Sequence, residues 1–231
     1  MVDGAHILPL ATSQDQKRRD DGDEGPNTGG MGAYSPAPVV TPEVFERTMK
    51  TIIEPTVRGM AAEGNTYTGF LYAGLMIDHM GVPKTLEFNC RFGDPETQPI
   101  MMRLQSDLVA LCAAGATGKL DTVTAQWDKR AALGVVMAAG NYPDEVRKGA
   151  AIAGLPESET GNSKVFMAGA SLKDDQVVTN GGRVLCVVGL GDSVAEAQDR
   201  AYEQVRKISW ADVYFRSDIG YRAIDREQGK A

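Results

Sequence analysis

The stretch LEFNCRF, residues 86–92, constrains the fold strongly because it alternates apolar and polar side chains. In an extended strand, successive side chains point to opposite faces. Glu87, Asn89 and Arg91 would therefore share one face, and the opposite, apolar face would be built by Leu86, Phe88, Cys90 and Phe92. The stretch predicts a strand with one core face. By itself it leaves open whether the polar face is a functional site or the wet surface of a half-exposed antiparallel strand.

The sequence around this strand predicts a β-hairpin. Residues 68–78 and residues 83–92 are strand-like runs that flank the short turn segment HMGV. On the second strand, Glu87 and Asn89 offer a carboxylate and an amide oxygen two residues apart, which suits a hard cation such as Mg²⁺. The planar fork of Arg91 suits a phosphate oxygen. Asparagine is a poor strand former, so its place in mid-strand favours a site.

A helix start is clear in the first half of the chain. Thr41, Pro42 and Glu43 supply a capping side chain, a proline at the first helical position and an acid in the first turn. Pro55 predicts a kink or an end, before a second helical piece that reaches Glu63. Apolar residues at helical spacing predict one further helix that ends near residues 115–118: Ile100, Leu104, Leu108 and Leu111.

The first 36 residues show no helical period. Asp3-Gly4 is a strong hairpin turn signal before a strand-like stretch at residues 6–11, and with so little chain before that turn we expect the sheet to continue into residues that precede Met1. Residues 13–36 predict a long loop. Part of it, GPNTGGMG, holds four glycines in eight residues. Such a loop can bring backbone N–H groups to an anion, but the residues alone favour a surface loop without a bound ligand.

The second half of the chain has a different pattern. A polar stretch near residue 125 predicts a boundary between a domain of residues 1–125 and a domain of residues 126–231. Apolar strands follow, and then one helix from Ser193 to Lys207, opened by a capping box of Ser193 with Glu196. The TNGG segment before the last strand is read as a tight turn. The predicted fold class is α+β.

Composition excludes several classes of function. A formal net charge of −7 argues against a nucleic-acid partner. No apolar run is long enough to span a bilayer and no signal peptide is evident, so we expect a soluble, cytoplasmic protein without a membrane partner. Two histidines, His6 and His79, give little support to histidine metal sites or triads. The three cysteines stand far apart in apolar contexts that predict reduced, buried thiols: Cys90, Cys112 and Cys186.

Five motifs together resemble the phosphoribosylamine–glycine ligase (glycinamide ribonucleotide synthetase) family of the ATP-grasp superfamily. They are ATSQDQKR, GPNTGGMGAYSPAPVVT, GNTYTGFLYAGLM, EFNCRFGDPETQ and TNGGRVLCVVGLG. The resemblance implies the second half of an ATP-grasp module, with an antiparallel sheet and helices, followed by a small α+β C-terminal domain. It also implies a carbon–nitrogen ligase of purine biosynthesis that joins glycine to 5-phosphoribosylamine, using ATP and forming a glycyl phosphate.

The resemblance assigns roles residue by residue. Glu87 and Asn89 would bind Mg²⁺ or Mn²⁺, and Arg91 would be catalytic, stabilising the γ-phosphoryl group during transfer. Asp15 and Asp94 match positions that hold the glycine ammonium group. The predicted substrate-binding residues are Asp15, Asp94, Gly29, Gly30 and Gly32.

Two departures from the family pattern leave an alternative open. Many ATP-grasp enzymes carry a third acidic ligand on the preceding strand, where this chain has Ala73, Gly74 and Leu75. The family's N-terminal half, with its ATP-clasping segment, would precede Met1, so we expect the chain to be inactive alone. The alternative is a non-catalytic fragment, or a metal- and nucleotide-binding subunit that needs a separate N-terminal chain.

Overall fold

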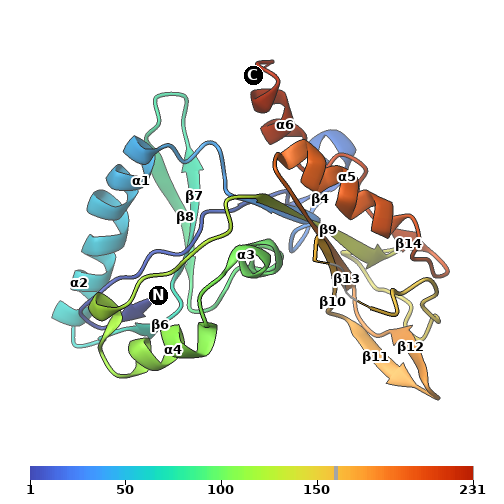
Figure 1. Ribbon diagram of the computed structural model, residues 1–231, viewed down its shortest axis with the longest axis horizontal. Helices are drawn as coiled ribbons and strands as arrows, with labels where there is room; N and C mark the ends of the chain where they lie inside the picture. The colour runs from blue at the N-terminus through green and yellow to red at the C-terminus, as the bar shows by residue number, and fades with distance from the viewer. Residues whose placement is uncertain (159–160, 231) are drawn as a thin grey trace. The chain divides into compact units, whose positions relative to one another are not determined.

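The computed structural model describes residues 1–158 and 161–230, which form two compact units. The chain passes between the units several times, so each unit contains separate segments of sequence. Unit 1 comprises residues 1–12, 37–93 and 104–128. Unit 2 comprises residues 13–36, residues 94–103 and the chain from residue 129 onward. Each unit has its own sheets, helices and core (Figure 1).

Unit 2 is built on a six-stranded antiparallel sheet. The strand order is β10-β13-β9-β5-β2, and β14 also pairs with β9. The strands are β2 (Gln14–Asp15), β5 (Gly32–Ser35), β9 (Ala131–Ala139), β10 (Ser163–Met167), β13 (Arg183–Gly191) and β14 (Val213–Tyr214).

The centre of this sheet is buried on both faces, as its apolar strands require. Every residue of β9 is buried. Helix α5 (Val194–Val205) covers the face that carries Leu133 and Val135, and α3 (Thr97–Arg103) covers the face that carries Val136. Gly189 permits the close approach of α5, because a Cβ atom there would lie 2.3 Å from the carbonyl oxygen of Ala197.

Three smaller features complete unit 2. β3 (Arg18–Asp20) and β4 (Glu24–Asn27) form a hairpin around a short 3-10 turn, η1 (Asp21–Asp23). A second hairpin and a helix that packs on α5 are β11 (Ala170–Lys173), β12 (Gln176–Thr179) and α6 (Tyr221–Glu227).

Unit 1 pairs a helical rod with a β-hairpin (Figure 1). The rod consists of α1 (Pro42–Thr48), a π-helical segment η2 (Met49–Ile53) and α2 (Glu54–Ala62). The hairpin consists of β7 (Tyr72–Ile77) and β8 (Pro83–Asn89). A small core around Leu8 and Leu111 lies among β1 (Val2–Asp3), β6 (Thr68–Gly69), α4 (Leu108–Ala116) and η3 (Leu120–Thr122).

The local sequence signals are confirmed where they are strongest. The Thr41 hydroxyl accepts a hydrogen bond from the Val44 N–H at 3.3 Å and caps α1. The helical path does not end at Pro55, because Ile53 and Glu54 keep helical φ and ψ; the π-helical segment directly before Pro55 accommodates its missing N–H. Ser193 caps α5, but the reciprocal bond to Glu196 comes from the N–H of Asp192.

Three predictions about secondary structure are wrong. Residues 13–36 form four strands instead of a loop, because β5 pairs with the buried strand β9. Residues 6–11 contribute a single bridge, between Ile7 and Val2. The helix predicted from Ile100 onward is two helices, because the Asp107 side chain caps α4 by accepting hydrogen bonds from the N–H groups of its first turn.

The predicted division into residues 1–125 and 126–231 differs from the compact units. The last passage of the chain between units lies at residues 128–129, close to the predicted boundary. However, residues 13–36 and 94–103 belong to unit 2, since they supply β2, β5 and α3 to its sheet and core.

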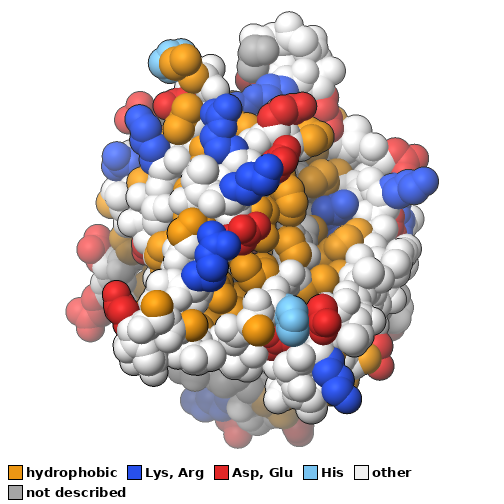
Figure 2. Space-filling model, turned by 90° about the vertical axis from the view of Figure 1, so that its left-hand side faces the viewer, with side chains coloured by type: hydrophobic (Ala, Val, Ile, Leu, Met, Phe, Trp, Pro, Cys, Tyr) orange, Lys and Arg blue, Asp and Glu red, His pale blue; other side chains and the backbone are white. Residues whose placement is uncertain are grey.

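The surface of unit 1 exposes many large apolar side chains. Figure 2 shows the side on which α1 and α2 lie, where apolar side chains gather beside a band of charged ones. The exposed apolar residues of unit 1 are Phe45, Met60, Met76, Met80, Val82, Leu86, Phe88 and Val109. Among residues 1–158 and 161–230, no helix has the length and apolar character needed to cross a membrane.

Candidate functional site

The predicted metal ligands stand on β8 in unit 1. Glu87 pairs with Gly74 of β7, and Asn89 pairs with Tyr72, in regular antiparallel register. Between these pairs the strand has no irregularity, so Glu87 and Asn89 point to the same face, as the alternation predicts. Gly74 leaves room for the acid, because a Cβ atom at that position would lie 3.1 Å from Cγ of Glu87.

A β-bulge limits this alternation on its N-terminal side. Leu75 pairs with Thr85 and Gly74 pairs with Glu87, so Leu86 is an extra residue on β8. The apolar face predicted for the strand is not buried: the exposed fraction is 65% for Leu86 and 39% for Phe88. Cys90 is also exposed, against the prediction that it is buried. The hairpin forms a sheet of only two strands, and so small a sheet does not by itself build a buried core on its apolar face.

The oxygen donors on β8 fit a hard cation. Glu87 brings a carboxylate and Asn89 an amide oxygen, and the Asn89 amide nitrogen is buried without a hydrogen-bond partner. Within the described part of the chain, no group of three or more His, Cys, Asp and Glu side chains could hold a metal. A cation at Glu87 and Asn89 would therefore complete its shell with water and phosphate oxygens, as Mg²⁺ commonly does.

Arg91 lies two residues beyond the end of β8, so strand geometry does not place it on the face of the two ligands. Its Nη1 atom donates a hydrogen bond to the carbonyl oxygen of Phe92 at 2.7 Å. The ring of Phe92 stacks on Phe70, with 3.8 Å between ring centroids. Arg91 is exposed, and this hydrogen bond ties its guanidinium group to the backbone of Phe92.

The predicted substrate residues all belong to unit 2. Asp15 on β2 pairs with Ala33 of β5, and its carboxylate lies 3.7 Å from the ammonium nitrogen of Lys17. Gly32 on β5 pairs with Val135 of β9. It must be glycine because a Cβ atom there would lie 2.6 Å from Ile219 Cγ2. These two positions are thus fixed by sheet pairing and core packing.

The N–H groups of the glycine loop before β5 donate hydrogen bonds to acceptors within the protein. Thr28 N–H donates to the carbonyl oxygen of Lys17, and Gly30 N–H donates to the Thr28 hydroxyl at 3.0 Å. Gly29 N–H donates to the Tyr142 hydroxyl at 2.8 Å, and the next N–H, of Met31, donates to the Gln16 carbonyl oxygen. In this structure these four N–H groups are therefore not offered to an anion.

Sequence reasoning missed Arg183, which binds Asp94. Its Nη2 atom lies 2.8 Å from Asp94 Oδ2, in an ion pair whose arginine side chain is 21% exposed. The available signal was a charged residue at the start of an otherwise apolar strand, directly after the turn TNGG. Tyr142, which holds Gly29, carried no sequence signal.

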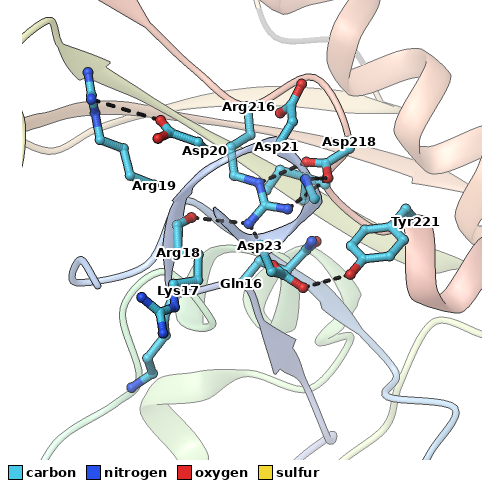
Figure 3. A network of polar contacts seen from close by, with 12 residues as sticks. Gln16, Lys17, Arg18, Arg19, Asp20, Asp21, Asp23, Arg216, Asp218 and Tyr221 are labelled. Atoms are coloured by element: carbon cyan, nitrogen blue, oxygen red, sulfur yellow. Dashed lines mark hydrogen bonds and ion pairs between the residues drawn. The ribbon is translucent and has the colours of Figure 1, made fainter. Parts of the chain in front are cut away.

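A second cluster that the sequence did not reveal surrounds Arg216 (Figure 3). The Arg216 side chain is fully buried. Its Nε and Nη2 atoms donate to the two oxygens of Asp218, at 2.7 and 2.8 Å. Its Nη1 atom donates to Asp23 at 2.8 Å and to the Arg18 carbonyl oxygen at 3.1 Å. Tyr221 also donates to Asp23, at 2.6 Å.

The cluster carries strongly perturbed charges. Burial alone would lower the pKa of Arg216, but its bonds to Asp218 and Asp23 raise that pKa above the ordinary value. Burial alone would raise the pKa of Asp23, and the hydrogen bonds from Tyr221 and Arg216 hold it below its usual range instead. The arrangement fixes η1 to residues 216–221, so it anchors the segment that leads to the glycine loop.

The structure therefore gathers the predicted residues into two groups, each within its own unit. Unit 1 holds Glu87 and Asn89 on one strand face, with Arg91 just beyond. Unit 2 holds Asp15 and Gly32 on paired strands, and it brings Gly29, Gly30 and Asp94 together around Arg183.

Comparisons with known proteins agree with this architecture. Residues 1–97 match the family model for phosphoribosylglycinamide synthetase, ATP-grasp (A) domain, and residues 132–222 match the model for its C domain. The chain is 66% identical to phosphoribosylamine–glycine ligase of Vibrio cholerae over 230 residues, which covers 100% of this chain and 54% of the relative. It is 68% identical to the ligase of Escherichia coli strain K12 over 229 residues, 99% of this chain and 53% of the relative.

Solved structures give the same result. The crystal structure of phosphoribosylamine–glycine ligase from Thermotoga maritima matches with a TM-score of 0.85 and 39% identity, covering 95% of this chain and 54% of that one. The biotin carboxylase domain of a thermophilic 2-oxoglutarate carboxylase matches with a TM-score of 0.66 over 100% of this chain and 50% of that one. At 15% identity, the second likeness shows the fold alone.

The fold and these matches define the class first: the chain carries part of an ATP-grasp module, followed by a C domain. Two models of a single family together match most of the chain, and the relatives are highly identical throughout. The chain belongs to the phosphoribosylglycinamide synthetase family. It spans about half the length of the curated relatives that it matches.

Proposed function

We propose that the chain serves ATP-dependent ligation of glycine to 5-phosphoribosylamine, as the second half of a phosphoribosylamine–glycine ligase that acts in the cytoplasm. The observation that carries the proposal is 66% identity over the whole chain to a ligase of that name. In this reaction the γ-phosphoryl group of ATP passes to the glycine carboxylate, which gives ADP and glycyl phosphate. The amine of phosphoribosylamine then attacks the carbonyl carbon, and phosphate and a proton leave.

Glu87 and Asn89 are proposed to hold Mg²⁺ or Mn²⁺ through their side-chain oxygens. Bound there with ATP, the cation would neutralise charge on the phosphate oxygens. The two residues contribute a fixed donor pair, because β7 and β8 hold them in register and Gly74 leaves the acid its space. Support comes from the donor chemistry and the shared strand face.

Arg91 is proposed to stabilise the γ-phosphoryl group as it is transferred. An arginine suits this role because it keeps its charge at any working pH and its planar fork matches phosphate oxygens. Holding the side chain in place before the reaction avoids reorganisation during the step. The hydrogen bond to the Phe92 carbonyl oxygen supplies part of that order.

Asp15 and Asp94 are proposed to bind the glycine ammonium group, and Gly29, Gly30 and Gly32 to shape the substrate region. The internal hydrogen bonding of the loop means that shape and side chains would provide the recognition there, instead of free N–H groups. Both acids already have a cationic neighbour, Arg183 at 2.8 Å from Asp94 and Lys17 at 3.7 Å from Asp15, so a bound ammonium group would share each carboxylate with that neighbour.

The test is substitution in the full-length ligase, with ADP release measured at varied Mg²⁺. Glu87→Ala and Asn89→Ala should lower kcat sharply and raise the Mg²⁺ concentration needed for half-maximal rate. Arg91→Ala should lower kcat by about 100-fold or more. Unit 1 offers matched controls, Glu63→Ala and Asn65→Ala, whose residues are exposed at the end of the helical rod. Normal turnover in all three test variants would rule out the assignment.

A second candidate function is a supporting role in the same reaction. This candidate is a subunit that binds metal and nucleotide and works with a separate N-terminal chain. The pair of Glu87 and Asn89, which β7 and β8 hold in register within unit 1, supports metal binding by this chain itself. Mixing the purified 231-residue chain with the N-terminal half of a relative distinguishes the two. Activity that appears only on mixing supports complementation. A folded chain that remains inactive in both settings supports a non-catalytic role.

A further inference from the structure

Arg183 joins two separate segments of unit 2 that carry predicted substrate residues. Its Nη1 atom donates to the carbonyl oxygen of Gly29 at 2.7 Å and to that of Asp94 at 2.8 Å. The carbonyl oxygen of Gly30 lies at the outer limit, 3.5 Å away. Its Nη2 atom binds the Asp94 carboxylate at 2.8 Å. One guanidinium group thus ties the glycine loop to the segment that begins α3.

Tyr142 fixes the same loop from another side. Its hydroxyl accepts the hydrogen bond from Gly29 N–H at 2.8 Å. Its ring covers Gly182, where a Cβ atom would lie 2.4 Å from Cδ2 of the ring. Because Gly182 directly precedes Arg183, the start of β13 supplies one clamp and supports the other.

The loop has little freedom inside this arrangement. A Cβ atom at Gly29 would lie 2.9 Å from Cζ of Arg183 and 3.0 Å from the Tyr142 hydroxyl. Gly30 has a φ of +117°, and a Cβ atom there would lie 2.3 Å from Cδ of Pro95. The two glycines are therefore needed to admit these neighbours, which explains the glycine pair without a bound anion.

The guanidinium group of Arg183 donates its hydrogen bonds to acceptors within the protein. Three carbonyl oxygens, that of Gly30 at the outer limit, and one carboxylate surround it, and its side chain is 21% exposed. A group bound in this way orders its neighbours more readily than it binds a substrate. Its ordered neighbours are the residues proposed to contact glycine.

We propose that Arg183, assisted by Tyr142, is a positioning residue of the ligase that sets the glycine loop and Asp94 in their substrate-binding geometry. The inference rests on the proposed function, since it concerns the same substrate residues. A misplacement of about 1 Å in substrate-positioning groups can cost on the order of 100-fold in rate. Loss of the clamp should therefore appear in glycine binding and turnover, and not in ATP binding.

The experiment compares Arg183→Gln, Arg183→Lys and Tyr142→Phe in the full-length ligase, with KM measured separately for glycine and ATP. Arg183→Gln should raise KM for glycine at least about 10-fold with less than a twofold change in KM for ATP. Tyr142→Phe keeps the ring over Gly182 and every charge, so it should give a smaller change in the same direction. Arg183→Lys should fall between Arg183→Gln and the unsubstituted enzyme.

The matched control is Arg200→Gln, since Arg200 also pairs with an acid, Glu196, and with a backbone carbonyl oxygen, that of Leu190. It should leave both KM values unchanged. Unchanged KM values for glycine in all test variants, with only a lower melting temperature, would overturn the inference. A lower KM for glycine in Arg183→Gln would also overturn it, because Arg183 would then be competing for Asp94. An inactive unsubstituted enzyme would instead overturn the proposed function, and this inference with it.

Discussion

Replacement of Arg216 by methionine should destabilise unit 2 by about 3 kcal/mol, near the lower end of the range of about 3–5 kcal/mol for breaking a buried ion pair from one side. The lower end applies because Asp23 and Asp218 keep 17% and 22% exposure and retain other partners. Asp23 keeps the hydroxyl of Tyr221, and Asp218 keeps the N–H of Gly22.

The assay is thermal and urea unfolding of the 231-residue chain, followed by the fluorescence of the buried Trp210 in unit 2. Trp127 belongs to unit 1 and is replaced by phenylalanine in all samples, so that the signal reports unit 2 alone. A loss of about 3 kcal/mol corresponds to a fall of about 6–12 °C in Tm for a chain of this size. Lys207→Met, which breaks an exposed pair with Glu203, is the control and should change Tm little.

The pH dependence provides a further check on Arg216. The pKa values of Asp23 and Asp218 are held below their usual range in the folded state, by hydrogen bonds that outweigh burial. Such carboxylates stabilise the fold above their unfolded pKa of about 3.9, and this contribution disappears as pH falls through the lower folded value. The difference between the unsubstituted chain and Arg216→Met should be constant from about pH 7 to 5 and shrink below about pH 4. A loss under about 1 kcal/mol at pH 7, or a difference that grows in acid, would refute the reasoning.

Three further outcomes are expected. Thr41→Ala removes a helix cap with a long hydrogen bond of 3.3 Å, so urea unfolding should show a loss of about 0.5–1 kcal/mol in unit 1. The hydrogen bond with Asp3 raises the pKa of His6 above its usual 6.5. The protonated His6 therefore stabilises unit 1 fully below pH 6.5, and this stabilisation is lost as pH rises through the folded pKa. His6→Gln should remove this pH dependence from the Tm of unit 1. Thiol reagents should label the exposed Cys90 in the folded chain and Cys186 only after unfolding, since burial raises the pKa of Cys186 to about 12; rapid labelling of Cys186, followed by mass spectrometry, would contradict the packing.

Sequence reasoning succeeded where the determining interactions are local. The hairpin of β7 and β8 follows from alternation and a short turn, and the Thr41 cap follows from a bond between residues three apart. The shared face of Glu87 and Asn89 follows from the same alternation. Their role as metal ligands rests on the resemblance and stays a prediction.

It failed where distant pairing overrides local preference. β5 has the sequence Gly-Ala-Tyr-Ser, which contains no β-branched residue. It becomes a strand because it pairs with the buried strand β9, which lies about 100 residues later in the sequence. The contact of Arg216 with Asp23 joins residues 193 positions apart. Arg183 reaches Gly29 across 154 positions. No local pattern encodes such pairs, so the clamps of the candidate site could be seen only in the folded structure.

The interlaced path of the chain limits how this protein can be divided or recombined. A cut at the predicted boundary of residues 125–126, or at residues 128–129, removes β2 and β5 from the sheet of unit 2 and α3 from the face that it covers. Residues 132–135 of β9, which pair with β5, would then form an unpaired apolar edge, because β14 pairs only with Ala138 and Ala139; such an edge favours aggregation. Gene fusion or exchange at that point would not transfer a working module. The coding sequence of the two units is therefore expected to be inherited as a whole.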